Sequence, residues 1–311
     1  MQPPSRSSTA PAAIQQSGED LYPARAERRL GCRDLPSFLI VGPPRTGTTW
    51  LHEVLSAHAR LPAPTKETRF FDRHFERGVL WYLKHFPARR DARPAGEVAP
   101  TYFASPAARD RVARVLPNAK LVIIFRHPVQ RLVSMYRMKR AYGLIGWSLD
   151  EALERDPELI ASSRYATHLR EWQGLFSAEQ IRICLFDELG RNPQAFIDCV
   201  AEHVGIAGFA LQPSQLEQIF SAGRMTAPRS FLATRAATSM ADWCKARRFD
   251  SVVAGVRNSS LMKLFLGGGE PFADTPAHTL ERIAELVMPE IEALEGMLNR
   301  DLTAWKAPAV F

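Results

Sequence analysis

An arginine and three threonines follow directly on a short apolar run near residue 40. The run, 38–41, is rich in branched side chains and predicts a buried strand. Apolar residues with helical spacing come next: Trp50, Leu51, Val54 and Leu55. A tight turn over 42–47 would then lead into a helix N-terminus, where unpaired amides and the helix dipole favour an anion. Because Arg45 adds a cation, the pattern predicts a phosphate or sulfate site, with an ordinary turn that binds nothing as the alternative.

The two glycines of this turn have the spacing of a nucleoside triphosphate-binding loop. Gly42 and Gly47 are separated by four residues, as in the pattern G-x-x-x-x-G-K-[ST]. Thr48 stands where that pattern requires the lysine that reaches the β- and γ-phosphates. The substitution argues against an ATPase or kinase and leaves a shorter phosphate as the favoured ligand.

A second cation follows the apolar run 120–125. This unbroken run predicts a parallel strand that is covered on both faces. Arg126 stands at its carboxyl end, where open α/β sheets bind ligands. Ser134 comes about two helical turns into the helix that we expect from 129 to 140. Taken alone, such an arginine and such a serine are usually structural.

The dipeptide Lys66-Glu67 places a carboxylate beside a cation in a segment that predicts a short strand or an extended loop. A carboxylate close to a bound anion can take the proton from an attacking hydroxyl or amine. An exposed ion pair on a loop is the competing interpretation.

Strands alternate with helices along the chain, which predicts a parallel sheet flanked by helices on both faces. Strands are expected at 38–41, 120–125 and 181–186, and further helices near 78–86, 105–116, 129–140, 165–172 and 194–203. The apolar pattern of 283–298 predicts a kinked helix or two helical pieces, because Pro289 interrupts it. The composition of residues 1–34 predicts a disordered tail, and 35–311 would form one domain.

The segment 44–50 resembles the loop with which sulfotransferases bind 3′-phosphoadenosine 5′-phosphosulfate (PAPS). Their pattern is [KR]-[ST]-G-T-T, and many members carry lysine where this chain carries Arg45. The resemblance implies that Arg45 and the loop amides hold the 5′-phosphate and stabilise charge on the leaving oxygen; the loop residues are Thr46, Gly47, Thr48 and Thr49. Trp50 would lie near the adenine or simply fill the core.

The second cluster resembles the sulfotransferase element R-x7-S, whose arginine and serine hold the 3′-phosphate. This resemblance assigns Arg126 and Ser134 to the nucleotide. A third nucleotide-binding element has a loose counterpart at Gly223 and Arg224, with Arg229 as a competing candidate. A sulfuryl group carries less negative charge than a phosphoryl group, so amides and cationic side chains can take the role of Mg²⁺. No metal is therefore expected.

The segment 65–72 is similar to the K-E-x-x-F-F-D segment of the heparan sulfate N- and 3-O-sulfotransferases. In that branch the glutamate is the candidate base, which implies Glu67 as the base and Lys66 as an electrostatic helper, with a histidine as the alternative base. Val98 departs from the 3-O branch, which often has lysine there, and weakens the case for a heparan-like acceptor. Four cations would line an acceptor cleft or form a solvated loop: Lys84, Arg89, Arg90 and Arg93.

The composition limits the partners. The formal net charge of +7 favours anions in general, but no basic stripe with interleaved aromatics indicates nucleic acid. The four cysteines show no CxxC spacing, so we expect them to be ordinary reduced thiols. No apolar run approaches the roughly 20 residues of a membrane-spanning helix, and the first residues lack the apolar stretch of a signal peptide. We expect a cytoplasmic protein whose oligomeric state the sequence does not indicate.

The residues and the resemblance together predict a PAPS-dependent sulfotransferase with a P-loop-like α/β fold. Its acceptor would be a hydroxyl or amine of a carbohydrate or of a glycosylated small molecule. A nucleotide-dependent phosphotransferase is one alternative, and a catalytically silent nucleotide- or glycan-binding protein is the other.

Overall fold

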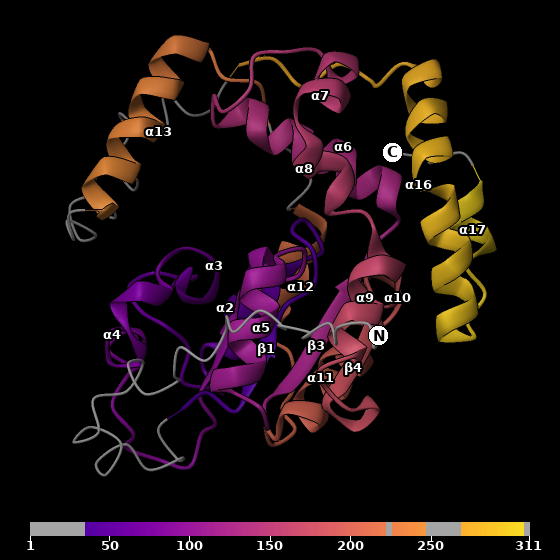
Figure 1. The fold of residues 1–311 in the computed structure, drawn as a ribbon. Coiled ribbons are helices and arrows are strands. Elements are labelled where there is room, and N and C mark those ends of the chain that lie inside the picture. Colours follow the sequence, from indigo (N-terminus) through magenta and orange to yellow (C-terminus); the bar gives the residue numbers. More distant parts are fainter. Residues whose placement is uncertain (1–34, 222–225, 247–268, 308–311) are drawn as a thin grey trace, which may run out of the picture.

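Four parallel strands form the centre of the fold (Figure 1). The computed structural model describes residues 35–221, 226–246 and 269–307. Its strands are β1 Phe38–Ile40, β2 Gly96–Val98, β3 Lys120–Phe125 and β4 Ile181–Leu185, and the sheet order is β2-β1-β3-β4. All three pairings are parallel, with Leu39 opposite both Glu97 and Leu121. The predicted fold class is therefore confirmed.

Successive residues of the strands enter two different cores, because side chains alternate across a sheet. Leu39, Leu121 and Ile123 face one core, together with the helices α3, α5, α6, α9 and α16. Phe38, Ile40 and Val122 face the other, which contains α2 and α11. Both faces of the sheet are covered, as the unbroken apolar run of β3 predicts.

Helices and short 3₁₀ turns connect the strands and complete the chain. Those up to β3 are α2 Thr48–Leu55, α3 Phe70–Arg73, η1 Phe75–Arg77, α4 Val79–Leu83, η2 Pro100–Tyr102 and α5 Pro106–Val115. Those between β3 and β4 are α6 Pro128–Ala141, α7 Leu149–Arg155, α8 Pro157–Ala161, α9 Tyr165–Gln173 and η3 Ala178–Gln180. Those after β4 are α10 Phe186–Arg191, α11 Pro193–Val204, α12 Pro213–Ser221, α13 Phe231–Ala246, α16 Ala277–Leu298 and α17 Thr303–Lys306.

Several helices begin where their sequence dictates. Proline is the first residue of α5, α6 and α11, where its missing N–H removes no helical bond. Ser105 caps α5 by accepting from the amide of Ala108, and Asn192 caps α11 by accepting from that of Ala195. The expected helices lie where predicted, at α2, α5, α6, α9 and α11, and α4 occupies part of the expected 78–86.

The structure decides between two pairs of alternatives. The segment 66–72 is a loop that runs into α3, as the loop alternative predicts, and not a strand. The C-terminal pattern forms one helix, α16, with Pro289 inside it, and not two helical pieces. The three-residue strand β2 was not expected, because it is short and carries a glutamate. The expected tail, residues 1–34, lies outside the described residues, so the domain boundary stays a prediction.

The strand order creates a switch point between β1 and β3. The chain leaves β1 towards β2 on one side, and leaves β3 towards β4 on the other. The segments that follow these two strands therefore diverge at the carboxyl edge, which is where open α/β sheets bind ligands. Both predicted anion-binding clusters follow these two strands. No helix within the described ranges is long and apolar enough to cross a membrane.

Replacing Gly42 by alanine should destabilise the fold. A Cβ at Gly42 would lie 2.5 Å from the backbone nitrogen of Ile124, and neither chain can yield without moving a strand. We expect a loss of about 1–3 kcal/mol in the free energy of unfolding, as for other overpacked sites. Urea unfolding measures it. Gly296→Ala is the control, since nothing lies within 4 Å of that Cβ in α16; it should stabilise by up to about 1 kcal/mol. Equal effects of the two changes would contradict the packing argument.

Candidate active site

The turn after β1 is held in a conformation that leaves its amides to a ligand. Arg45 and Gly47 both have left-handed backbones, with φ of 76° and 81°. The hydroxyl of Thr46 donates to the carbonyl of Pro43 at 2.9 Å and is buried, so it closes the turn and does not face a ligand. A non-glycine residue at positive φ stores strain and is typical of functional turns.

The helix α2 begins directly after this turn. Gly47 is its N-cap and provides no side-chain hydrogen bond to the first amides, which are the groups that an anion can accept from. Thr49 is exposed, whereas Thr48 is buried. Trp50 is buried in the core, and its indole N–H donates to the carbonyl of Gln215 in α12 at 2.7 Å. This position fits the core-filling alternative; a contact with adenine stays a prediction.

Arg126 reaches the same turn from the end of β3. Its Nη1 donates to the carbonyl oxygen of Arg45 at 3.4 Å. Its guanidinium lies over the ring of Phe186, 4.9 Å from the centroid, and the same ring lies 2.9 Å from where a Cβ of Gly47 would be. Tyr165 donates to the carbonyl of Arg126 at 3.0 Å. Within the described part of the chain, the buried Nε of Arg126 has no hydrogen-bond partner, so a donor remains for a ligand.

Ser134 joins the two predicted clusters. The Nε of Arg45 donates to its hydroxyl at 3.0 Å, which links the turn after β1 to the second turn of α6. Burial lowers the pKa of both Arg45 and Arg126, and the charge of Arg45 further lowers that of Arg126. Two partly desolvated cations side by side disfavour each other, so a bound polyanion would stabilise this arrangement.

Lys66 and Glu67 lie beside the same turn. The ammonium of Lys66 donates to the hydroxyl of Thr49 at 3.3 Å and lies 3.6 Å from a carboxylate oxygen of Glu67. Burial lowers the pKa of Lys66, and burial raises the pKa of Glu67. The desolvated carboxylate is thereby a stronger base at neutral pH than an exposed glutamate. The structure thus brings together five predicted residues: Arg45, Lys66, Glu67, Arg126 and Ser134.

Two histidines lie close to these residues. His52 is on α2, and burial followed by the charge of Lys66 lowers its pKa to about 4. His127 follows Arg126, is buried, and also has its pKa lowered by burial. Both imidazoles are neutral at neutral pH. A base with a pKa near 4 is weak at the pH of most cells, so Glu67 fits the role better than His52.

The structure describes only one of the three residues that were predicted to form a third nucleotide-binding element. Gly223 and Arg224 lie outside the described residues. Arg229 is exposed and comes just before α13. Its contact with the nucleotide stays a prediction.

The basic loop before β2 lies at the wrong edge of the sheet for an acceptor cleft. The loop leads into the amino end of β2. Arg93 donates to the carbonyl of Ala57, which follows the C-terminus of α2 in the chain. Arg93 also pairs with Asp91. Because the anion-binding turn lies at the carboxyl edge, the loop that carries Arg89, Arg90 and Arg93 is better interpreted as a solvated surface.

The sequence analysis assigned no role to a buried glutamate near the site. Glu97 lies on β2, has no solvent exposure, and accepts hydrogen bonds from the amide and the hydroxyl of Thr68 at 2.6 Å and 2.8 Å. Thr68 directly follows Glu67. The signal available in the sequence was a single acidic residue within a short apolar segment, which does not reveal burial by itself.

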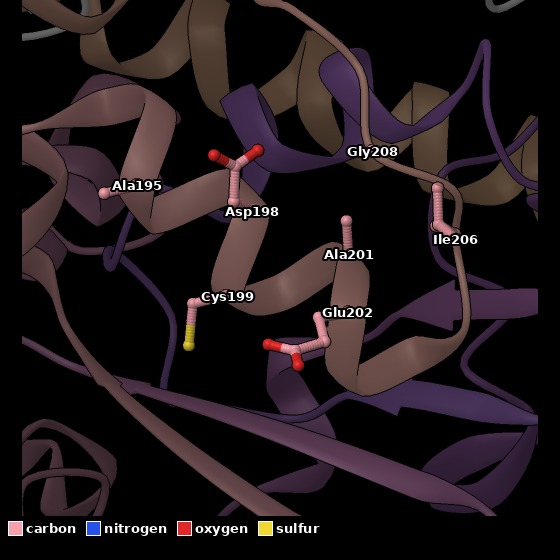
Figure 2. A pocket seen from close by; sticks show the side chains of 7 residues that line it. All are labelled: Ala195, Asp198, Cys199, Ala201, Glu202, Ile206 and Gly208. Carbon is pink, nitrogen blue, oxygen red and sulfur yellow. The ribbon is translucent and has the colours of Figure 1, made fainter.

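The groove on the outer side of α11 is not the anion site. Figure 2 shows Asp198, Cys199 and Glu202 projecting from the helix into this groove of about 640 Å³. Its two carboxylates would repel a phosphate. Among the described residues no cluster of His, Cys, Asp or Glu could hold a metal ion, and the expected absence of a metal stays a prediction.

Comparisons with known proteins agree with this arrangement. The profile of the family described as "Sulfotransferase domain" matches residues 35–252. The bifunctional heparan sulfate N-deacetylase/N-sulfotransferase 2 of Bos taurus is 32% identical over 201 residues, which are 57% of this chain and 23% of the relative. The N-deacetylase/N-sulfotransferase 1 of Caenorhabditis elegans is 29% identical over 199 residues, 58% of this chain and 23% of the relative. The matched part is thus less than a quarter of each relative's length.

A solved structure shares the fold. The sulfotransferase from Alicyclobacillus acidocaldarius superposes with a TM-score of 0.63 at 21% identity, and the superposition covers 88% of this chain and 99% of that one. At this identity the likeness concerns the fold alone.

Replacing Phe186 by alanine should weaken nucleotide binding. The ring supports the guanidinium of Arg126 and fills the space beside Gly47. A cation–π contact contributes about 0.5–2 kcal/mol, so calorimetry with adenosine 3′,5′-bisphosphate should show affinity reduced by about fivefold. Phe209→Ala is the matched control: this ring packs partly buried on the same core and stacks on His58 at 3.6 Å. Equal losses for both variants would contradict a specific role for Phe186.

Proposed function

The chain belongs to the sulfotransferase domain family, and on that premise we propose that it transfers a sulfuryl group from PAPS to a hydroxyl or amine of a carbohydrate or glycosylated acceptor. The observation that carries the proposal is the meeting of the two cation clusters. Arg126 donates to the backbone of Arg45, and Arg45 donates to Ser134. A ligand with an anionic group at each of two ends fits this pair of turns.

The nucleotide would be held by residues from two strand ends. The amides of the turn 46–49 and Arg45 would bind the 5′-phosphosulfate at the start of α2. Arg126 and Ser134 would bind the 3′-phosphate, and the buried Nε of Arg126 supplies a donor for it. The hydroxyl of Ser134 accepts from Arg45 and can still donate its own proton to a phosphate oxygen. The fit rests on these donors and on the two desolvated guanidiniums.

The reaction would move one group and one proton. The acceptor oxygen or nitrogen forms a bond to sulfur while the bond from sulfur to the bridging phosphate oxygen breaks. Glu67 takes the proton of the acceptor, and adenosine 3′,5′-bisphosphate leaves with the bridging oxygen. Lys66 donates to the exposed Thr49, and the charge of Arg45 acts on Lys66. Both cations would stabilise negative charge on the leaving side. No metal is part of the proposal.

The acceptor class follows from two observations. The segment 65–72 carries the K-E-x-x-F-F-D pattern, and curated relatives are named heparan sulfate N-deacetylase/N-sulfotransferases. Because the chain matches only 23% of those relatives, their substrate is a proposal here and not an inherited property. Val98 is fully buried, so an acceptor contact at that position is not part of the proposal. We also propose a reducing, cytoplasmic setting, which the free Cys184 and Cys199 suit.

Binding of adenosine 3′,5′-bisphosphate tests the nucleotide half of the proposal. Calorimetry should give one site per chain for the wild type. Arg126→Ala and Ser134→Ala should weaken binding by about tenfold or more, since each removes a hydrogen bond to a charged group worth about 1.5–3 kcal/mol. Arg93→Ala, on the opposite edge of the sheet, is the control and should bind normally. Absence of binding to the wild type would overturn the proposal, and preference for ATP with Mg²⁺ would favour a phosphotransferase.

Transfer of labelled sulfate from PAPS tests the catalytic half, with chemically de-N-sulfated heparin as the amine probe. Burial raises the pKa of Glu67, so kcat should fall as the pH decreases through that raised pKa and the base becomes protonated. Glu67→Gln should lower kcat by about 10²–10⁴, the usual contribution of a general base. Glu53→Gln is the control, because Glu53 also faces Lys66 but is exposed. A Glu67→Gln enzyme with normal turnover would remove Glu67 from this role, and nucleotide binding without transfer to any acceptor would indicate a silent binding protein.

A further inference from the structure

Glu97 is a fully buried carboxylate that the proposed reaction does not use. It lies in the middle of the three-residue strand β2, beside Leu39 of β1. A carboxylate is costly to bury unless its oxygens accept hydrogen bonds. A residue that only filled the core at this position would be apolar, as its neighbour Val98 is.

Both oxygens of Glu97 accept hydrogen bonds, and the two shortest to Oε1 come from the segment that carries the proposed base. Oε1 accepts from the amide of Thr68 at 2.6 Å and from its hydroxyl at 2.8 Å. Oε2 accepts from the hydroxyl of Tyr82 at 2.9 Å. Tyr102 donates to both oxygens at 3.3–3.4 Å. These bonds to Oε1 connect β2 to the residue directly after Glu67.

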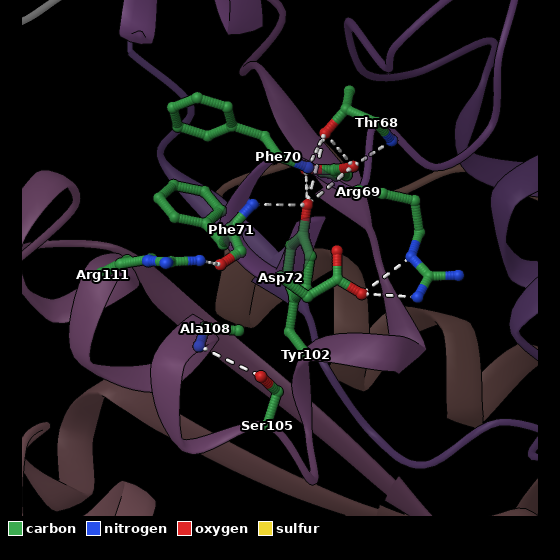
Figure 3. Close-up of polar contacts among 10 residues, drawn as sticks. Thr68, Arg69, Phe70, Phe71, Asp72, Tyr102, Ser105, Ala108 and Arg111 are labelled. Carbon is green, nitrogen blue, oxygen red and sulfur yellow. Dashed lines mark hydrogen bonds and ion pairs between the residues drawn. The ribbon is translucent and has the colours of Figure 1, made fainter. Parts of the chain in front are cut away.

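The contacts of Thr68 extend to the residues that follow it in the segment. The hydroxyl of Thr68 accepts from the amide of Phe70 at 3.2 Å. It also lies 3.3 Å from the hydroxyl of Tyr102, which accepts from the amide of Phe71 at 3.5 Å (Figure 3). Arg111 donates to the carbonyl of Phe71 at 2.8 Å. The segment is thus fixed at Thr68 and after it, whereas before it the ammonium of Lys66 reaches Thr49 of α2 and Glu67 lies beside that ammonium.

We propose that Glu97 is a positioning residue: its ionised carboxylate holds the amide and the hydroxyl of Thr68 and thereby sets where Glu67 stands beside the acceptor. The inference rests on the proposed function, because it assigns Glu67 the role of base. Displacing a reacting group by about 1 Å can lower a rate by about a hundredfold. Glu97 therefore acts on catalysis without touching the substrates.

The charge of Glu97 is part of this role. Four donors converge on the carboxylate, and protonation would add a fifth hydrogen among them. Burial raises the pKa of Glu97 to about 7, while the bonds from Thr68 and Tyr82 oppose the rise and the charge of Glu67 adds to it. The titratable groups that face it are Tyr82 of α4, Tyr102 of η2 and Glu67. As the pH falls below 7, the carboxylate takes up a proton and the hold on Thr68 weakens.

Three variants separate positioning from simple stability. Glu97→Gln keeps the volume and removes the charge. Thr68→Val removes the hydroxyl that Glu97 accepts from. Tyr82→Phe is the matched control, because it removes an equally buried donor from the other oxygen and keeps the ring that stacks on Phe70 at 4.7 Å. At pH 8 we expect kcat with de-N-sulfated heparin to fall by about tenfold to a hundredfold in the first two variants and by less than about threefold in Tyr82→Phe.

The pH profile gives a readout that a merely structural residue would not change. In the wild type both Glu67 and Glu97 become protonated as the pH falls, and activity needs both in the ionised form. On the acid side, the slope of log kcat against pH should therefore exceed one. Glu97→Gln should reduce it to the single titration of Glu67. Tyr82→Phe should move the steep limb to higher pH, because ionised Glu97 loses a donor. The affinity for adenosine 3′,5′-bisphosphate should stay within about threefold in all three variants.

Amide hydrogen exchange of the ligand-free protein distinguishes this inference from the proposed function. The amide of Thr68 should exchange at least about tenfold faster in Glu97→Gln than in the wild type, at unchanged melting temperature. If the wild type transfers no sulfate, the proposed function fails, and the exchange rate still decides whether Glu97 holds the segment. Unchanged exchange, or a kcat in Glu97→Gln within twofold of the wild type at pH 8, would overturn the inference. A loss of kcat that only follows the loss of folded protein would overturn it too.

Discussion

The site depends on the parallel pairing of β1 between β2 and β3. This register brings the ends of all four strands to one edge, so that residues far apart in sequence meet there. The pairing also demands close backbone approach: the turn after β1 passes so near Ile124 that only glycine fits at position 42. Phe186, at the end of β4, then fills the space beside Gly47 and supports Arg126. A shift of one residue in any strand would separate these groups and turn their side chains to the other face.

The electrostatic arrangement follows from that geometry. Arg45, Lys66 and Arg126 all have their pKa lowered by burial, which means that the fold keeps these cations partly out of water. An arginine at position 45 has a consequence that lysine would not have. Its Nε donates to Ser134, so one side chain connects the turn after β1 to the second turn of α6. The proposed nucleotide end of the site is therefore preorganised by hydrogen bonds between the turns themselves.

The sequence predicted those parts of the site that depend on local pattern. The turn 42–47, the strand before Arg126 and the helix bearing Ser134 each have a local signal, and the resemblance then paired them. Glu97 and Phe186 could not be found in this way, because their roles come from the neighbours that the sheet order gives them. The loop around Arg93 was assigned to an acceptor cleft as one alternative because its charge is visible in the sequence. Its place at the amino edge is visible only once β2 is known.

Glu97 and Val98 of β2 face different cores of the protein. Glu97 and Val98 are adjacent, so their side chains point to opposite faces of the sheet. Glu97 meets Tyr82 and Tyr102, which belong to the core on the α3 and α5 side. Val98 packs into the other core, together with α2. A substitution at position 98 therefore acts on the face that carries α2 and the proposed nucleotide turn, and leaves the contacts between Glu97 and Thr68 intact. The chain can therefore differ at position 98 from the 3-O branch that it resembles and still hold the proposed base, Glu67, in place.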